Sequence, residues 1–406
     1  MFHRKRTYES SGSLGQLAWY RFKKNKVSFG SLLFIGCVAF LSIISYLVTP
    51  DKTPMVNEQN LLLATLKPFT RVQILKFKKN QDIQQRSLLH LMLYGQENPY
   101  YLIPISSFKF VSDSIVVTEF SKDSTGIQKA YHLAEVCYAL ADKDAIQNLG
   151  DRIKIKTKEG SMQLLSINSL REQVLRHNLT HRTYLLGTDR YGRDMLSQLV
   201  LGTRVSLSVG FISVAISLLI GVLLGALAGY YGGWIDALIS WLINVIWAVP
   251  TLLLVIAMTF ALGKGFWQVF VAVGLTMWVE VARVVRGQFL GLREKEFVEA
   301  ARALGYRDFR IIFKHILPNA MAPVIVISAA NFASAILLEA GLSFLGIGVQ
   351  PPMPSWGSMI KENYAYIILD YAYLAILPGV AIMVMVLAFM LVGNGLRDAL
   401  DVRSID

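Results

Sequence analysis

The sequence predicts an all-α polytopic membrane protein with six transmembrane helices and an α+β insertion outside the membrane between the first and second helices. Of its 406 residues, 54% are hydrophobic and only 17% are charged, whereas soluble proteins carry about a quarter charged residues. The charges are also uneven, since residues 49–204 hold 36 of them and residues 205–406 only 24. The chain therefore combines an apolar membrane part with a middle part of soluble composition.

The net charge of +12 does not indicate nucleic-acid binding, because it is not gathered in one region. Residues 1–48 contribute +6, residues 49–204 another +6, and residues 205–406 are neutral. A basic nucleic-acid-binding domain concentrates its Lys and Arg residues on one face. We therefore expect a lipid bilayer, and no nucleic acid, as a partner.

Six apolar segments supply the predicted membrane spans. Each is about as long as the ~20 residues that a helix needs to cross the hydrocarbon core. The first segment lacks a small-x-small cleavage pattern, so we expect an uncleaved anchor rather than a signal peptide. The segments are residues 27–48, 205–230, 235–262, 266–286, 321–347 and 368–393.

Basic residues predict which ends of these spans face the cytoplasm. A run of Arg21, Lys23, Lys24 and Lys26 precedes the first span. The connection from Arg283 to Lys314 carries eight basic and four acidic residues, while the short connections on the opposite side carry only Lys264 and Lys361. Because basic residues accumulate in cytoplasmic loops, both termini, Arg403 included, are expected in the cytoplasm and the long loop 49–180 outside.

The cytoplasmic N-terminal segment, residues 1–26, has an amphipathic stretch at 13–26. Ser13 can cap a helix there, and such a helix can lie on the membrane surface with its lysines at lipid phosphates. The alternative is a simple basic flank of the first span. The residues expected to face lipid are Leu14, Leu17, Ala18 and Phe22.

The long loop 49–180 has the patterns of a small α+β domain. Alternation over 107–120 predicts one or two strands, and the run 151–160 predicts a strand with Ile153 and Ile155 on its apolar face. Apolar spacing over 128–142 predicts a helix.

This insertion shows no constellation of catalytic or metal-binding residues. His177 and His181 at i and i+4 on one predicted helix face could bind a metal only weakly without a third ligand, so two surface histidines are the default interpretation. Cys37 lies in an apolar stretch and Cys137 in the polar middle part of the chain, so no disulfide between them is expected. Asn178-Leu-Thr has the form of a glycosylation sequon, which we interpret as a chance match. No cofactor site and no enzymatic activity are expected.

The connection 287–320 has the strongest local pattern. Residues 296–304 predict a short helix, and Gly305 can take the positive φ that closes it. A second amphipathic piece follows, with Pro318 expected to end it before the next span. Its apolar residues are Phe309, Ile312, Phe313 and Ile316. A short helix closed by glycine suits a docking knob for a cytoplasmic protein; the alternative is an ordinary basic loop.

The stretch from Glu299-Ala-Ala-Arg-Ala-Leu-Gly305 to Pro318 resembles the EAA loop of ABC importer permeases, with His315 replacing an apolar residue of the general pattern. Two further stretches, 186–207 and 341–357, are similar to motifs of the dipeptide, oligopeptide and nickel importer family, in its C-type subunit. The resemblance covers 1–48 and 185–406 but not 50–180. The motif residues are Gly187, Asp189, Gly192, Arg193, Asp194, Arg204, Trp356 and Gly357.

This resemblance implies the type I ABC importer permease fold, in a bacterial inner membrane, and import of peptides or a related small solute. It implies a B-type permease as heterodimer partner, an external binding protein, and two ATPase subunits that use ATP and Mg²⁺. The chain itself has no Gly-x4-Gly-Lys-Ser/Thr phosphate loop. The residues implied to couple to the ATPase are Glu299, Ala300, Ala301, Arg302, Gly305 and Arg307, with Glu299 as the charge partner.

Two rival functions remain open at this point. A mechanotransmission-type ABC subunit would act on an external partner without moving solute, which the large insertion makes worth considering. A membrane-anchored enzyme lacks a visible catalytic set. For the insertion itself we retain three roles: a docking surface for the binding protein, a lid over the external gate, or an inert elaboration.

Three polar or helix-breaking residues within the spans are candidates for gating or translocation. Pro250 removes a backbone donor and predicts a kink, either moving or static. Asn244 lies in a region where relatives usually carry charged residues. Its side chain can face the pathway or form a hydrogen bond with a neighbouring helix. Glu339 is a pathway candidate because intramembrane acids are costly, or else a hydrated residue near the interface.

Two packing features complete the predictions. Glu280 and Arg283 are spaced to form an ion pair. Gly221, Gly225 and Gly229 form two overlapping Gly-x3-Gly repeats, which permit close approach of another helix. The partner permease is one candidate for that helix.

Overall fold

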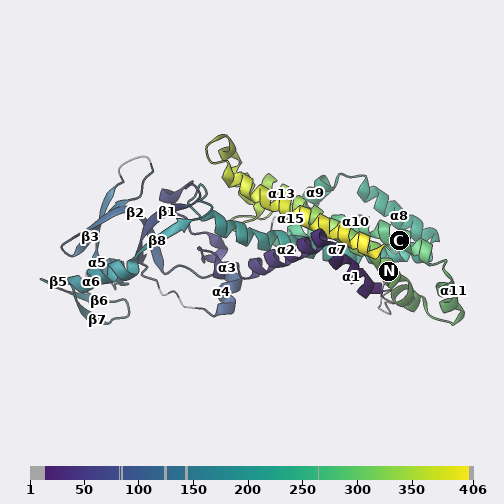
Figure 1. Ribbon diagram of the computed structural model, residues 1–406, viewed down its shortest axis with the longest axis horizontal. Helices are drawn as coiled ribbons and strands as arrows, with labels where there is room; N and C mark the ends of the chain where they lie inside the picture. Colours follow the sequence, from purple (N-terminus) through teal and green to yellow (C-terminus); the bar gives the residue numbers. More distant parts are fainter. Residues whose placement is uncertain are drawn as a thin grey trace, which may run out of the picture.

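The computed structural model describes residues 14–401 except 82, 84, 85, 123–125, 142–144 and 264. The predictions for Ser13, Lys264 and Arg403 lie outside these residues. The molecule is elongated, with a bundle of long helices between a β-rich domain at one end and helix α11 near the other (Figure 1). The long spans therefore separate the two polar regions that the sequence singles out.

All six apolar segments are helical, which confirms the predicted fold class. Among the residues that the structure describes, five helices are long and apolar enough to cross a membrane, and a sixth span results if the bent pair α8–α9 is counted as one. Their bounds are α2 Lys26–Ile43, α7 Met195–Tyr231, α8 Gly233–Trp247, α9 Thr251–Leu262, α10 Phe266–Leu292, α13 Leu317–Leu345 and α15 Tyr373–Leu400. The short helix α3 (Ser45–Val48) continues α2.

Helix α7 begins ten residues before the predicted span, because the Asp194 side chain accepts a hydrogen bond from the Ser197 backbone N–H and caps the helix there. Its 37 residues give a length of about 55 Å. The first turns of α7 thus project beyond the hydrocarbon core, toward the β-rich domain.

The N-terminal segment forms helix α1 (Leu14–Lys24), and Asn25 caps α2 by accepting a hydrogen bond from the Ser28 N–H. The prediction that Phe22 faces lipid is wrong. Its side chain is 1% exposed and packs in the core cluster that includes residues of α15. Trp19 and Tyr20 of the same helix are exposed instead.

Helices α7 and α10 pack closely along the glycine repeats. A Cβ added at Gly225 would lie 2.5 Å from the Ala282 carbonyl oxygen, and one at Gly229 would lie 2.5 Å from the Cβ of Phe289. Gly221 meets α10 in the same way at Val281. The repeats therefore serve contact within this chain, and the interpretation that they face a partner permease is wrong.

The described part of the insertion forms two antiparallel sheets between Thr70 and Tyr184. The first has the strand order β4-β3-β2-β1-β8 and the second β5-β6-β7. Their strands are β1 Thr70–Lys78, β2 Tyr100–Val111, β3 Ser114–Glu119, β4 Gln128–His132, β5 Ile146–Leu149, β6 Arg152–Lys156, β7 Met162–Ser166 and β8 Leu179–Tyr184. The short helices among them are α4 Leu88–Tyr94, α5 Leu133–Cys137 and α6 Ile167–Gln173.

The α+β character of the insertion is confirmed, with one error in detail. The alternating run gives the hairpin β2–β3, and both Ile153 and Ile155 are fully buried. The predicted helix over 128–142 is wrong, because its first five residues pair with β3 as strand β4 and only Leu133–Cys137 is helical. Tertiary pairing outweighs the weak local periodicity here.

His177 and His181 do not share a helix face. His177 lies in a π-helical turn, Val174–Asn178, and His181 lies in strand β8. Asn178, the sequon residue, is 4% exposed and donates hydrogen bonds to the carbonyls of Lys76 and Val136. Cys37 and Cys137 are both free thiols, as expected, and burial raises the pKa of Cys137 to about 12.

Candidate coupling surface and pathway residues

The predicted docking knob is helix α11, Glu296–Ala303. Gly305 has φ +74°, and the helix closes with a hydrogen bond from the Tyr306 N–H to the Ala301 carbonyl. Val298 is fully buried and Ala301 is 4% exposed, both in a cluster with residues of α10 and α13. One face of α11 is thus seated on its own chain, which fixes the direction of the opposite face.

The opposite face combines apolar and charged side chains. Glu299, Ala300 and Arg302 are exposed, as are Gly305 and Arg307 after the helix. Ala301 is the exception among the predicted coupling residues, because it packs inward. The large apolar side chains exposed on and beside α11 are Phe297, Leu304, Phe309 and Phe313. Exposed apolar groups bordered by charges are typical of a protein-binding surface.

The segment after Gly305 runs into the next span without a stop. Helix α12 (Asp308–Arg310) is followed by a π-helical turn, Ile311–Ile316, and then directly by α13. The prediction that Pro318 ends the helix is wrong. Pro318 lies in the first turn of α13, where a missing backbone N–H costs little.

The unusual His315 has a structural partner in this turn. Its ring stacks on Tyr306, with centroids 5.6 Å apart, and its carbonyl accepts a hydrogen bond from the Asn319 side chain. Tyr306 in turn lies under the Arg310 guanidinium at 4.0 Å. His315, which replaces an apolar residue of the general EAA pattern, therefore stabilises the second half of the loop by stacking on Tyr306.

Polar contacts tie the α11 region to the spans. The Tyr230 hydroxyl at the end of α7 donates to the Asp308 carboxylate at 2.6 Å. Arg293 after α10 donates to the Gly229 carbonyl at 3.1 Å, and Arg286 pairs with Asp236 of α8 at 2.5 Å and 2.7 Å. A displacement of α11 would therefore be transmitted to α7, α8 and α10.

The third span is broken at Pro250. Helices α8 and α9 meet at an angle of 94°, much sharper than the predicted kink. The Asn244 side chain is exposed on α8 and makes no hydrogen bond to another helix within the described residues. The predicted Glu280–Arg283 pair is not formed, because the Arg283 guanidinium lies over the Trp247 ring at 3.2 Å.

Glu339 is fully buried between α13 and α7. Ser343 donates a hydrogen bond to one carboxylate oxygen at 2.7 Å, and Ser206 donates to the other at 3.3 Å. The alternative of a hydrated interfacial glutamate is therefore wrong. The side chain joins two spans through hydroxyl donors.

The motif before α7 forms a tight loop with two glycines at positive φ. Gly187 and Gly192 both have φ +75°, and a Cβ at either position would overlap a backbone oxygen, of Leu66 and Asn60 respectively. Any other residue would push the loop away from the segment that follows the first span. The glycines are therefore required by close approach of two backbones.

Charged motif residues lock this loop onto the core. Arg193 Nε donates to Asp189 at 2.7 Å, and its Nη2 donates to Glu362 near the end of α14 (Trp356–Asn363) at 2.5 Å. Burial alone would lower the pKa of Arg193, but these two carboxylates raise it above the ordinary value. Trp356 donates its indole N–H to the Leu199 carbonyl at 3.0 Å, and Gly357 packs against the Ala340 backbone.

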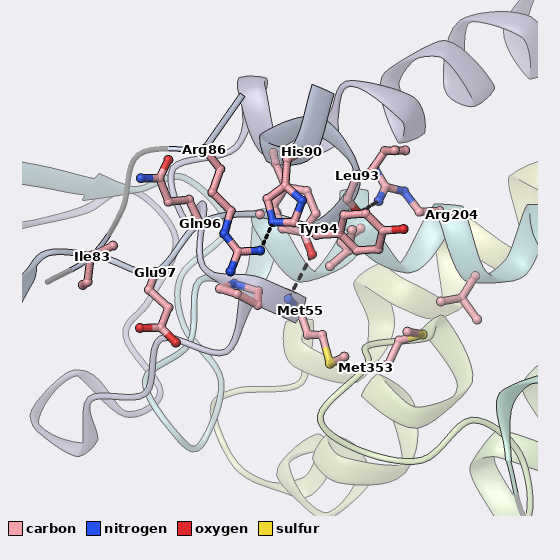
Figure 2. A pocket seen from close by; sticks show the side chains of 15 residues that line it. Met55, Ile83, Arg86, His90, Leu93, Tyr94, Gln96, Glu97, Arg204 and Met353 are labelled. Carbon is pink, nitrogen blue, oxygen red and sulfur yellow. Dashed lines mark hydrogen bonds between the residues drawn. The ribbon is translucent and has the colours of Figure 1, made fainter. Parts of the chain in front are cut away.

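Arg204 of α7 lies beside Leu93 of α4 (Figure 2). Its guanidinium donates to the carbonyls of Ser42 and Ile43 at the end of α2, and to those of Met92 and Leu93 in α4. Beside it lies a cavity of about 700 Å³ between α4, the start of α7 and the loop that carries Met353. An arginine of the core thus holds a helix of the insertion.

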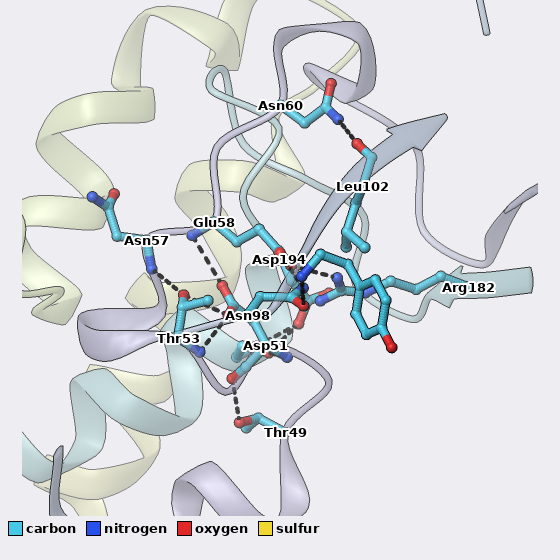
Figure 3. Close-up of polar contacts among 12 residues, drawn as sticks. Thr49, Asp51, Thr53, Asn57, Glu58, Asn60, Asn98, Leu102, Arg182 and Asp194 are labelled. Atoms are coloured by element: carbon cyan, nitrogen blue, oxygen red, sulfur yellow. Dashed lines mark hydrogen bonds and ion pairs between the residues drawn. The ribbon is translucent and has the colours of Figure 1, made fainter. Parts of the chain in front are cut away.

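A second polar network, which was not predicted, holds the start of the insertion against strand β8. Asp51 is 1% exposed and accepts hydrogen bonds from Thr53 and from the Glu58 N–H. Glu58 pairs with Arg182 of β8 at 2.9 Å and accepts from Asn98 (Figure 3). The members are up to 131 positions apart in the chain, so no sequence pattern could have indicated them.

Comparison with known proteins agrees with this arrangement. Residues 221–405 match the family described as binding-protein-dependent transport system inner membrane component, and residues 13–68 match the N-terminal transmembrane domain of oligopeptide transport permease C. A dipeptide transport system permease of Alkalihalophilus pseudofirmus is 45% identical over 215 residues, which are 53% of this chain and 70% of that protein. The chain belongs to this family of ABC importer permeases.

A second relative gives the same result. A glutathione transport system permease of Pectobacterium atrosepticum is 44% identical over 216 residues, 53% of this permease and 71% of that one. In the solved structures, an inward-facing methionine ABC transporter subunit aligns with a TM-score of 0.42 at 21% identity, over 51% of this chain and 98% of that one. The two family matches leave residues 69–220 of the permease between them, and these include both sheets of the insertion.

Proposed function

We propose that this permease is one membrane-spanning half of an ATP-driven importer for peptides or a related small solute. Its named relatives are permeases of dipeptide and glutathione systems, which share amide-linked amino acids as cargo. In the proposed complex the chain pairs with a B-type permease, receives solute from an external binding protein, and is driven by two cytoplasmic ATPase subunits in the bacterial inner membrane. Substrate choice is expected to depend mainly on the binding protein.

The observation that carries this proposal is the two-sided helix α11. Its inner face is fixed by Val298 and Ala301, so its outer face presents Glu299 and Ala300 in a constant direction. An ATPase groove that accepts this face would pull on the coupling loop when ATP closes the ATPase pair. The ties through Tyr230 and Arg293 would then carry the movement to the spans. Such a shift between inward- and outward-facing states requires only that ATP binding favour one of them.

Uptake by the reconstituted complex tests this function. The permease pair, the ATPase subunits and the binding protein are assembled in liposomes, and entry of a labelled dipeptide, glutathione and a longer peptide is measured with and without ATP. The proposal predicts ATP-dependent accumulation of at least one of them. ATP turnover that depends on the binding protein but moves none of these solutes would contradict it and favour the mechanotransmission alternative.

A further inference from the structure

Helix α4 of the insertion has an apolar composition and no buried side chain. Its sequence is Leu-Leu-His-Leu-Met-Leu-Tyr over residues 88–94, and none of these residues is buried in the structure. Leu88 and Leu89 are 73% and 71% exposed, while Leu93 and Tyr94 are 54% and 63% exposed. Leu93 and Tyr94 line the cavity beside Arg204. Leu88 and Leu89 lie outside it, and neighbouring large apolar side chains this exposed need a surrounding other than water.

The position of α4 is fixed relative to the spans. The Arg204 guanidinium binds the carbonyls of Met92 and Leu93 together with those of Ser42 and Ile43 at the end of α2. Arg204 is the last charged residue before a stretch of α7 that carries none up to Asp236. It therefore lies at the boundary of the hydrocarbon core, and its bonds to Met92 and Leu93 hold α4 at that depth.

The exposed apolar surface of α4 continues that of the first span. Leu41, Ile43, Leu47 and Val48 at the end of α2 and in α3 are all exposed, and α4 lies beside α3 (Figure 1). The C-terminus of α4 is also held close, since the Gln96 N–H donates to the Lys52 carbonyl. The exposed apolar side chains of α2, α3 and α4 thus form one continuous surface.

Polar groups border this surface on one side. The Arg86 guanidinium, just before α4, contacts the His90 ring nitrogen at 2.6 Å, and the His90 and Tyr94 rings lie 5.0 Å apart. Arginine and tyrosine are the residues that place a charged or polar tip among lipid headgroups while their apolar parts remain in the acyl region. The arrangement has the composition of a helix lying at a membrane interface.

We propose that α4 is an interfacial anchor, embedded at the boundary between headgroups and acyl chains, which holds the inserted domain on the bilayer beside the first span. The occupant of its exposed face is lipid. The sheets of the insertion are thereby fixed at a set height above the membrane, whatever solute the permease moves.

Depth measurement with spin labels tests the anchor. The full chain, carrying Cys37→Ser and Cys137→Ala, receives single cysteines by Leu88→Cys or Leu89→Cys and is placed in liposomes of phosphatidylcholine and phosphatidylglycerol. Two matched exposed leucines serve as references: Leu41→Cys on the first span and Leu149→Cys at the end of β5 in the sheet domain. Relaxation by oxygen, which enters lipid, is compared with relaxation by a water-soluble nickel chelate.

The labels on α4 should resemble the label at position 41, with an oxygen-to-nickel ratio several-fold higher than at position 149. A nickel accessibility equal to that at position 149 would overturn the proposal, because α4 would then lie in water. Exclusion of both reagents would overturn it as well, since α4 would then be covered by protein. The label at position 41 reports separately whether the chain is inserted in the membrane. A chain that does not insert is therefore distinguished from an inserted chain whose α4 lies in water.

Discussion

The Tyr230 hydroxyl donates a 2.6 Å hydrogen bond to the Asp308 carboxylate, and this bond joins the end of α7 to the loop that carries α11. The Arg302 guanidinium of α11 lies 5.5 Å from the same tyrosine ring. Tyr230 is 6% exposed, so its hydroxyl has little water to replace a lost partner. One residue of a span thus contacts both halves of the coupling loop.

Replacing this hydroxyl should loosen the loop without unfolding the chain. Tyr230→Phe removes a hydrogen bond to a charged group, which contributes about 1.5–3 kcal/mol. We expect amide hydrogen exchange in residues 296–316 to accelerate by about tenfold or more. Tyr231→Phe is the matched control, since the neighbouring tyrosine is 48% exposed. Equal protection in both variants would show that the bond does not hold the loop.

The glycine repeats provide a test of packing within the isolated chain. Gly225→Val would place a Cβ 2.5 Å from the Ala282 carbonyl oxygen, and overpacking of this kind costs about 1–3 kcal/mol or more. We expect a lower thermal aggregation temperature for the purified chain in detergent. Gly287→Ala on α10 has open space around the added carbon and should leave the temperature unchanged. An unchanged aggregation temperature for Gly225→Val would contradict this packing and favour contact of the repeats with another chain.

The buried Arg193 should be important for stability. Its guanidinium is paired with Asp189, which is 1% exposed, and with Glu362. Breaking a buried pair leaves an uncompensated charge, at a cost of about 3–5 kcal/mol, so Arg193→Met should strongly reduce the yield of folded protein. Glu362→Gln should cost less, because Glu362 is the more exposed partner and Asp189 remains. Equal yields of both variants, measured by size-exclusion chromatography, would contradict this assignment.

Cys137 should be almost inert to alkylation at pH 8. Burial raises the pKa of its thiol to about 12 from 9.0, and only the thiolate reacts. A rise of three pKa units lowers the thiolate fraction by about a thousandfold near neutral pH. The rate of iodoacetamide labelling, followed by mass spectrometry, should therefore be far below that of a free cysteine and increase about tenfold per pH unit up to pH 11. Fast labelling at pH 8 in folded protein would contradict the burial.

Local patterns predicted most of the elements that function requires. The apolar segments predicted the spans, because a run of about 20 apolar residues is typical of a transmembrane helix. Gly305 and the preceding helix formers gave α11, since both the helix and its end depend on neighbouring residues. The same holds for the hairpin β2–β3, whose alternation is regular over both strands.

What could not be predicted depends on contacts between distant residues. Phe22 is buried because α15, which begins 351 residues later in the chain, lies beside it. The angle of 94° at Pro250 is set by packing, since a proline fixes only that a break occurs. Residues 128–132 become a strand because β3 offers an open edge. The bonds of Arg204 to α4 join residues 111 and 112 positions apart, and no short motif records them.

The most direct test of the central claim, that α11 couples ATP hydrolysis to solute movement, is to measure ATPase docking and ATP-dependent uptake by the assembled complex in liposomes. Glu299→Ala with Gly305→Pro removes the exposed charge and the positive φ that closes the helix. Loss of a central interface residue costs ~2 kcal/mol or more, so ATPase docking and ATP-dependent uptake should both fall by about tenfold or more. Glu159→Ala, an exposed glutamate in the sheet domain, should retain both. Unchanged docking and uptake in the double variant would contradict the account.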